Sequence, residues 1–473
     1  MFFSFARTYT GSVIQIASTL ALVRLLSPEE FGVYSVAAGA VGIVSVLRDF
    51  GVARYIVQEK ELTPERQRTA FGIMILSAWS IGLLLFLLKG PFAAFYGNEQ
   101  LAEIFAILAI NFIVVPFGTP TIAILQRRLQ FGTIFVIGTI GAIVGAGTSV
   151  GMAVAGYGVV SLAWGPVANT VVVALCAVGV QVKTSLIAPS LREWRRVAGF
   201  SVTSTAEGVV MQLSIAAPDL IIGQTLGFEA VGLFNRAQNA VNLFRTMVIQ
   251  SIHGVAFPAF AEQVRSGEAV KPGYLKGVSY IASVSFPFFG FVFLFSYEII
   301  AVLFGQQWTD SVPSLQILAL FGAISSMASL NGMLILGLGE IRLLLYLTLV
   351  TTVMRVALVL PAAFYSIELV AAAHVVWGIL TLIVHKIALQ RLVDLRWIEL
   401  AEAARPGILI TLAVNLPMAM VMVLLDQVDL EAWVALVIAS LLAGFVWLLA
   451  IYAFRHPLWS EVERLLKFAQ RRS

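Results

Sequence analysis

Three arginines lie inside stretches that are otherwise apolar enough to cross a membrane. Arg236 and Arg245 fall within residues 230–258, and Arg355 falls near the middle of residues 343–366. A central arginine opposes membrane insertion by about 2.5–3.5 kcal/mol, so it usually faces water or an acidic partner and marks a pathway or a binding site. The three arginines therefore predict a pathway or a binding site within the membrane.

Polar side chains continue the pattern along the same stretch. Asn239 and Asn242 stand between Arg236 and Arg245 at intervals of three residues. Helical residues three apart drift slowly around one side of the helix. We therefore expect a broad polar stripe that faces a cavity, with the asparagines contacting polar cargo. Arg24, at the outer end of the first apolar stretch, adds another cation to this predicted substrate site.

Two acidic residues offer a different explanation of the buried cations. Glu207 and Asp219 lie in the preceding apolar stretch, residues 196–222. Either carboxylate could be the counter-ion of a nearby arginine, which would make the pair structural. Either could instead carry a proton or bind a cation and so couple transport to an ion gradient. The sequence leaves these alternatives open.

Signatures of catalysis, metal binding and nucleotide binding are missing from the chain. Neither a GxxxxGK[ST] nucleotide loop nor an HExxH motif occurs. The four histidines lack metal-ligand spacing, and the single cysteine, Cys176, lies in an apolar run. We expect no metal, no cofactor, no nucleic-acid partner and no enzymatic activity.

The composition predicts a chain embedded in lipid. Of its 473 residues, 59% are hydrophobic and 12% charged, whereas soluble proteins carry about 25% charged residues. A spanning helix needs about 20 mostly apolar residues, and about 14 stretches qualify. The candidate spans are residues 7–26, 31–53, 70–90, 101–125, 131–155, 158–182, 196–222, 230–258, 274–297, 311–338, 343–366, 368–390, 406–425 and 431–454.

The distribution of positive charge predicts the orientation. Most of the 30 Lys and Arg residues fall in loops on the side of the N-terminus, whereas Arg24 and Lys89 fall on the opposite side. Positive loops stay in the cytoplasm, so we expect both termini there. The basic, amphipathic tail from His456 onward is expected to lie on the anionic inner leaflet.

Short blocks recur in order about 200 residues apart, as in transporters built from two repeats. Gly11-x-Val13-x-Gln15 matches Gly208-x-Val210-x-Gln212, and Leu26–Tyr34 (LSPEEFGVY) matches Leu226–Phe234 (LGFEAVGLF). Two repeats of six spans each would have the same orientation in the membrane, and they could rock relative to each other about a central site.

We therefore predict an all-α polytopic membrane protein with about 14 transmembrane helices. Two six-helix repeats would surround a central cavity, followed by two additional helices. The predicted parts are residues 1–182, residues 183–395, the extra helices in residues 396–455, and a basic cytoplasmic tail of residues 456–473.

Three segments carry a family resemblance: RLLSPEEFGVYSVAAG (Arg24–Gly39), RDFGVARYIVQE (Arg48–Glu59) and LFGQQW (Leu303–Trp308). They resemble the Wzx-type oligosaccharide flippases, polysaccharide biosynthesis proteins of the multidrug/oligosaccharidyl-lipid/polysaccharide exporter superfamily. The resemblance implies alternating-access transfer of an undecaprenyl-diphosphate-linked oligosaccharide across the bacterial inner membrane. The cargo would be an exopolysaccharide, capsule or O-antigen (lipopolysaccharide) repeat unit.

The resemblance also implies partners: the lipid-linked oligosaccharide, the surrounding membrane lipids and a polysaccharide polymerase machinery. The self-contained repeat makes a monomer sufficient for transport. Three alternatives remain. A cation-coupled multidrug exporter of the same superfamily should have an acidic cavity. A membrane polysaccharide polymerase or ligase needs a large outer loop or a catalytic acid pair. A non-transporting scaffold would leave the buried arginines without a use.

Overall fold

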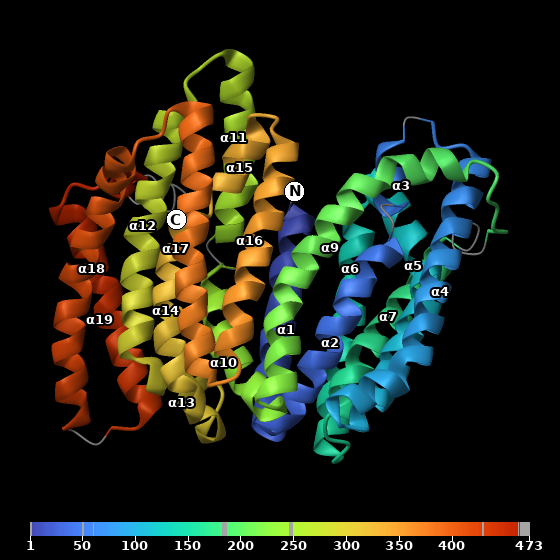
Figure 1. The fold of residues 1–473 in the computed structure, drawn as a ribbon, viewed down its shortest axis with the longest axis horizontal. Helices are drawn as coiled ribbons and strands as arrows, with labels where there is room; N and C mark the ends of the chain where they lie inside the picture. Colours follow the sequence, from blue (N-terminus) through green and yellow to red (C-terminus); the bar gives the residue numbers. More distant parts are fainter. Residues whose placement is uncertain are drawn as a thin grey trace, which may run out of the picture. The chain divides into compact units, whose positions relative to one another are not determined.

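The computed structural model describes residues 2–49, 52–59, 61–181, 187–245, 249–427, 430–461 and 463. Across these ranges all regular secondary structure is helical (Figure 1). The first helices are α1 (Phe2–Leu25), α2 (Pro28–Asp49), α3 (Val52–Gln58), α4 (Pro64–Tyr96), α5 (Gln100–Arg127), α6 (Phe131–Val154), α7 (Val160–Val180), α9 (Trp194–Thr225) and α10 (Phe228–Phe244). The later ones are α11 (Gln250–Ser266), α12 (Val270–Leu294), α13 (Ser296–Leu303), η2 (Gln306–Ser311), α14 (Val312–Met327), α15 (Asn331–Gly337), α16 (Ile341–Ala362), α17 (Ile367–Val393), α18 (Trp397–Asp426) and α19 (Ala432–Ala453).

Local sequence sets where several helices begin and end. Helix α4 begins after Thr63, whose hydroxyl accepts a hydrogen bond from the Arg66 amide at 3.3 Å, and Pro64 occupies its first position. It ends at Gly97, which adopts a φ of 65° that a residue with a Cβ rarely tolerates. Helix α17 begins in the same way after Ser366, whose hydroxyl accepts from the Leu369 amide.

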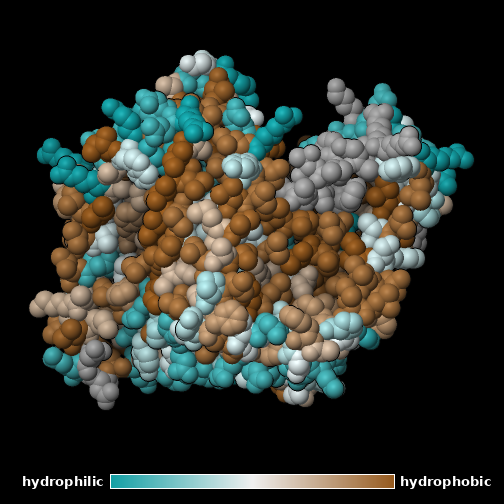
Figure 2. Space-filling view, in the orientation of Figure 1, coloured by the Kyte–Doolittle hydropathy of each residue, from teal (hydrophilic) through white to brown (hydrophobic). Residues whose placement is uncertain are grey.

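Eleven helices in the described part of the chain are long and apolar enough to cross a membrane. Each coincides with one of the predicted spans, from Pro28–Arg48 near the N-terminus to Ala432–Ala453 near the C-terminus. The protein is therefore a multi-pass membrane protein. Figure 2 shows the corresponding surface, in which hydrophobic side chains cover the middle of the helices and hydrophilic ones gather at their ends.

The three remaining predicted spans are helical but do not reach the same length and apolarity. The apolar part of α1 is Thr10–Leu25, and α9 is long but less apolar. Residues 230–258 were expected to form one helix; α10 ends at Phe244 and α11 begins at Gln250, and residues 246–248 between them lie outside the described ranges, so the single span stays a prediction. The total of 14 spans stays a prediction.

The chain divides into two compact units, Met1–Gly232 and Leu233–Ser473. In the first unit α6 packs on α7 and α1, α5 packs on α4 and α7, and α2 packs along α9. Helix α9 belongs to this unit although the repeat pattern assigns it to the second half of the sequence. The predicted repeat and the packing therefore divide the chain at different points.

In the second unit α12 packs between α14 and α18, while α17 packs on α14 and α16. The last two helices, α18 and α19, lie beside α12 (Figure 1) and share a core with Phe295. Trp447 fixes this arrangement because its indole N–H donates to the Ser283 carbonyl at 2.9 Å. The opposite side of α19 exposes large apolar residues such as Leu441, which is 72% exposed and suited to lipid.

Candidate functional site: a buried arginine and aromatic cluster and an accessible polar face

Arg355, near the middle of α16, is buried against α17. Its Nη2 lies 2.9 Å from Nε2 of His374, and its guanidinium carbon lies 4.6 Å from the ring centre of Trp377. The Trp377 indole N–H donates to the Thr351 carbonyl at 2.8 Å, which fixes the ring. A cation over a desolvated tryptophan gains about 2 kcal/mol, so the aromatic neighbour offsets much of the insertion cost of this arginine.

The hydrogen bonds of His374 define its protonation. Nδ1 lies 2.8 Å from the carbonyl oxygen of Val370, which can only accept, so Nδ1 carries a proton. Nε2 faces a guanidinium, which can only donate, so Nε2 must be unprotonated. His374 is thus a neutral imidazole that accepts a hydrogen bond from Arg355.

Arg236, on α10, is also buried and also lies among aromatic rings. Its guanidinium carbon is 5.2 Å from the ring centre of Trp308 and 5.8 Å from that of Phe304. Both rings come from the segment Leu303–Trp308, which carried part of the family resemblance. In this structure, that segment covers a buried cation.

Phe234 connects the surroundings of the two arginines. It lies two residues before Arg236 on α10, and its ring centre is 5.4 Å from that of His374. Phe321 on α14 completes the packing, stacked 5.6 Å from Trp377. We call this set the arginine–aromatic cluster; its members are Phe234, Arg236, Phe304, Trp308, Phe321, Arg355, His374 and Trp377.

The other predicted site residues lie in a different environment. On α10, Asn239 is exposed and Asn242 is partly exposed; Arg245, which directly follows the last residue of α10, is also exposed. Positions nine residues apart on a helix differ by about half a turn of rotation, which explains why Arg245 is exposed while Arg236 is buried. The four residues therefore do not share one surface. We call Asn239, Asn242 and Arg245 the accessible face of α10.

The remaining candidates lie on α1 and α9. Arg24 is exposed at the last turn of α1. Asp219 on α9 is partly buried and makes an electrostatic or hydrogen-bonding contact. The side chain of Glu207 lies outside the described residues, so its predicted role as counter-ion or coupling group stays a prediction.

Comparison with known proteins identifies the family. A family model described as "Polysaccharide biosynthesis protein" matches residues 21–313. The chain belongs to this family. It is 25% identical over 377 residues to the lipopolysaccharide biosynthesis protein WzxC of Escherichia coli, covering 76% of this chain and 73% of WzxC. It is 24% identical over 340 residues to the teichuronic acid biosynthesis protein TuaB of Bacillus subtilis, covering 71% and 70% of the two chains.

Solved structures show the same fold. The lipid II flippase MurJ, in an inward closed conformation, matches 97% of this chain and 99% of its own with a TM-score of 0.78 at 11% identity. An inward-facing multidrug resistance MATE family transporter matches 81% and 95% of the two chains with a TM-score of 0.64 at 14% identity. This polysaccharide biosynthesis protein thus shares its fold with these two solved membrane proteins.

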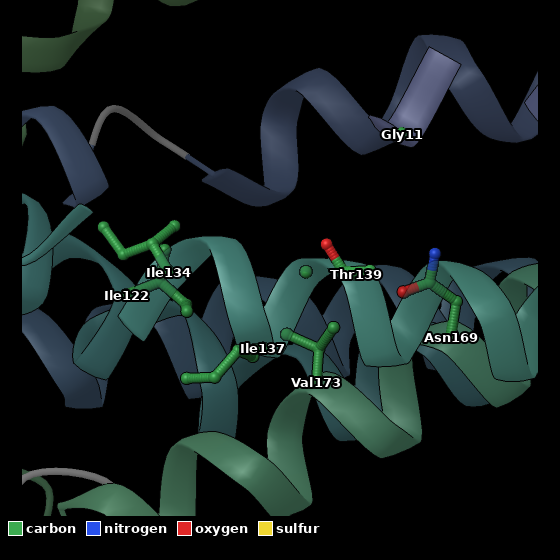
Figure 3. Close-up of a pocket in the computed structure, with 8 residues that line it drawn as sticks. Gly11, Ile122, Ile134, Ile137, Thr139, Asn169 and Val173 are labelled. Atoms are coloured by element: carbon green, nitrogen blue, oxygen red, sulfur yellow. The ribbon is translucent and has the colours of Figure 1, made fainter. Parts of the chain in front are cut away.

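A small pocket lies within the first unit of this polysaccharide biosynthesis protein. Its volume is about 260 Å³, and isoleucines such as Ile134 and Ile137 form its apolar part. Figure 3 shows Thr139 and Asn169 turned toward the helix that carries Gly11. Ligand pockets usually span about 300–1,000 Å³, so this space suits water or a small polar group and is too small for an oligosaccharide.

Basic residues near the ends of α4 and α5 hold neighbouring segments. Arg127 Nη1 donates to the Ile56 carbonyl at 3.0 Å, at the C-terminal end of α3. Arg66 lies 3.2 Å from Glu193 and 3.5 Å from Glu59. These arginines, which the sequence identified only as loop charges, order the chain at this end of the helices.

Sequence reasoning missed the aromatic and histidine partners of the buried arginines. One signal was present for His374. Arg355 lies seven residues before the end of α16 and His374 lies seven residues after the start of α17. A short turn between two spans therefore places them at the same depth. No comparable signal links Trp308 to Arg236, because the two are far apart in sequence.

Proposed function

We propose that this protein is a flippase that transfers an undecaprenyl-diphosphate-linked oligosaccharide across the bacterial inner membrane by alternating access. Both termini would lie in the cytoplasm, and the cargo would be a repeat unit of an exopolysaccharide, capsule or O-antigen. The protein would act without enzymatic turnover of its cargo. Membership of the polysaccharide biosynthesis protein family, together with the MurJ-like fold, is the observation that supports this function most strongly.

The accessible face of α10 supplies chemistry that suits such a cargo. Arg245 would bind the diphosphate, because a guanidinium donates parallel hydrogen bonds to phosphate oxygens. Asn239 and Asn242 would exchange hydrogen bonds with sugar hydroxyls, since an amide both donates and accepts. Arg24 would attract the anionic headgroup at the end of α1.

Arg236 and Arg355 belong to the same proposed site only if the arginine–aromatic cluster opens. In the present conformation both are more than 90% buried, so the cargo cannot reach them. Their contact with the diphosphate would therefore be specific to another state of the transport cycle. A ligand that binds one state more tightly than another shifts the equilibrium between them. Glu207 or Asp219 would couple transport of the cargo to a proton or sodium gradient.

The test is export of a lipid-linked oligosaccharide in a bacterial strain that lacks its own flippase. The wild-type protein should restore export, and Arg245→Ala should lower it by about tenfold, the equivalent of one lost charge-assisted contact. Arg342→Ala is the matched control, because Arg342 is an exposed arginine at the start of α16. Full export by Arg245→Ala would contradict the assigned role of this residue.

The multidrug exporter is the second candidate, since the fold is shared with a MATE family transporter. A carrier of organic cations needs anionic groups in contact with its cargo, whereas the accessible face of α10 carries an arginine and two asparagines. Efflux of a cationic dye by the wild-type protein, without any restored polysaccharide export, would favour the exporter over the flippase.

A further inference from the structure

The first turns of α2 and α10 contact each other through their backbones. A Cβ on Gly32 would lie 1.7 Å from the carbonyl oxygen of Phe228. A Cβ on Gly232 would lie 1.9 Å from the carbonyl oxygen of Pro28. All four residues belong to the first compact unit. Any side chain at either glycine would overlap a main-chain atom, so this crossing requires glycine on both helices.

The two contacts are reciprocal. Pro28 is the first residue of α2 and Phe228 is the first residue of α10, and each glycine follows four residues later on the same helix. Each glycine therefore packs against the backbone carbonyl of the first residue of the other helix. The same positions correspond in the matched segments Leu26–Tyr34 and Leu226–Phe234, so the crossing has an approximate two-fold axis relating the two halves of the sequence.

Close packing surrounds the crossing on both helices. Val33 on α2 and Val231 on α10 are fully buried. The Phe228 ring centre lies 6.1 Å from that of Tyr96, and the Tyr96 hydroxyl donates to the Leu220 carbonyl at 3.0 Å. The first turn of α10 thus contacts α4 as well as α2.

Resting on the flippase function proposed above, we propose that the reciprocal contacts of Gly32 and Gly232 form a gate at the end of the helices predicted to face away from the cytoplasm. The gate is closed in this structure. In an alternating-access carrier, release of cargo on that side requires helix ends from the two repeats to separate. A contact made by van der Waals packing of two backbones can separate and re-form in each cycle.

A short, reducible crosslink across the crossing tests the gate directly. Glu29 and Glu229 are exposed and follow the two contacting carbonyls, so Glu29→Cys with Glu229→Cys, in a Cys176→Ala background, places one thiol on each helix. Short thiol crosslinkers should join them in the resting protein. The crosslinked protein should export at least about tenfold more slowly and regain its export rate on reduction, because the crosslink would block every opening of the gate.

Glycine substitution provides an independent measurement. Gly32→Ala and Gly232→Ala should each lower the yield of the Glu29–Glu229 crosslink, because the added methyl group forces the backbones apart. Gly147→Ala is the matched control, since a Cβ on that helical glycine meets nothing within 4 Å. The yield is read without cargo and so does not depend on the flippase proposal.

Two outcomes would overturn the gate. If the crosslinked protein exports as fast as the reduced protein, the two helix ends stay in contact throughout transport and do not form a gate. If no crosslinker joins the cysteines in a folded, exporting protein, the helix ends do not meet in the resting state. Absence of export by the wild-type protein, with crosslinking intact, would instead contradict the flippase function.

Discussion

Arg355 on α16 and His374 on α17 face each other at one depth of a helical hairpin, with 2.9 Å between Nη2 and Nε2. The imidazole is held as an acceptor because its other nitrogen donates to the Val370 carbonyl. A neutral acceptor and the face of Trp377 therefore accommodate a cation in the interior of the second unit. Such an arrangement offsets part of the cost of burying the guanidinium.

Removing the imidazole should destabilise the second unit. His374→Ala leaves the Arg355 guanidinium with one acceptor fewer, and a hydrogen bond to a charged group is worth about 1.5–3 kcal/mol. We expect a clear fall in the midpoint of thermal unfolding in detergent. His374→Gln keeps an acceptor oxygen and should lose less.

A double-mutant cycle separates this contact from general packing. Once Arg355→Met has removed the cation, His374→Ala should cost less than it does in the wild-type protein, since no charge remains to be satisfied. Equal costs in the two backgrounds would show that the hydrogen bond contributes nothing to stability.

The ring of Trp308 should matter because it covers Arg236. Trp308→Leu removes the π face, and a desolvated cation–π contact is worth about 2 kcal/mol. Trp308→Phe keeps a ring and should retain more of the stability. Trp433→Leu is the control, because Trp433 is an exposed tryptophan of α19. If Trp308→Leu and Trp308→Phe unfold at the same temperature, the contact with the cation is not the cause.

The apolar pattern predicted most of the spanning helices, because a run of about 20 apolar residues has few alternatives to a membrane helix. The sequence was less informative around residues 230–258. Asn239, Asn242 and Arg245 lower the apolarity there, and hydropathy alone could not place the end of α10 at Phe244 or the start of α11 at Gln250.

The candidate site was predicted by residue type but not by environment. The cost of a buried charge identified Arg236 and Arg355 as residues that need special partners. Their partners include aromatic rings and a neutral histidine, which an inventory of acids could not indicate. The distinction between buried Arg236 and exposed Arg245 depends on the rotation of α10 relative to its neighbours, and tertiary packing sets that rotation.

Charge on the accessible face of α10 should control transport of an anionic cargo. Asn239→Asp would place a carboxylate where the diphosphate-linked oligosaccharide is proposed to bind, and like charges at an interface cost several kcal/mol. We expect export to fall by at least about tenfold with unchanged thermal stability, because the side chain is exposed. Asn239→Gln retains the amide and should export close to the wild-type level. Equal export by both variants would exclude Asn239 from the cargo path.

His456, just after α19, should make the attachment of the C-terminal helices dependent on pH. Its Nε2 lies 3.1 Å from the hydroxyls of Ser279 and Ser283 on α12, and its Nδ1 accepts from the Leu458 amide. Burial lowers the pKa of this imidazole below its ordinary value of 6.5. The folded protein therefore favours the neutral ring. Protonation would place an N–H on Nδ1, where it would face the Leu458 amide, which is itself a donor.

The sign of the effect follows from this depressed pKa. Above pH 6.5 the imidazole is neutral in both the folded and the unfolded chain, so its full contribution to stability is present. As the pH falls below 6.5 the unfolded chain binds a proton first, and stability declines until the folded pKa is passed. The midpoint of thermal unfolding should therefore fall between pH 8 and pH 5.5 in the wild-type protein and fall less in His456→Asn. An identical pH dependence in both proteins would assign the effect to other groups.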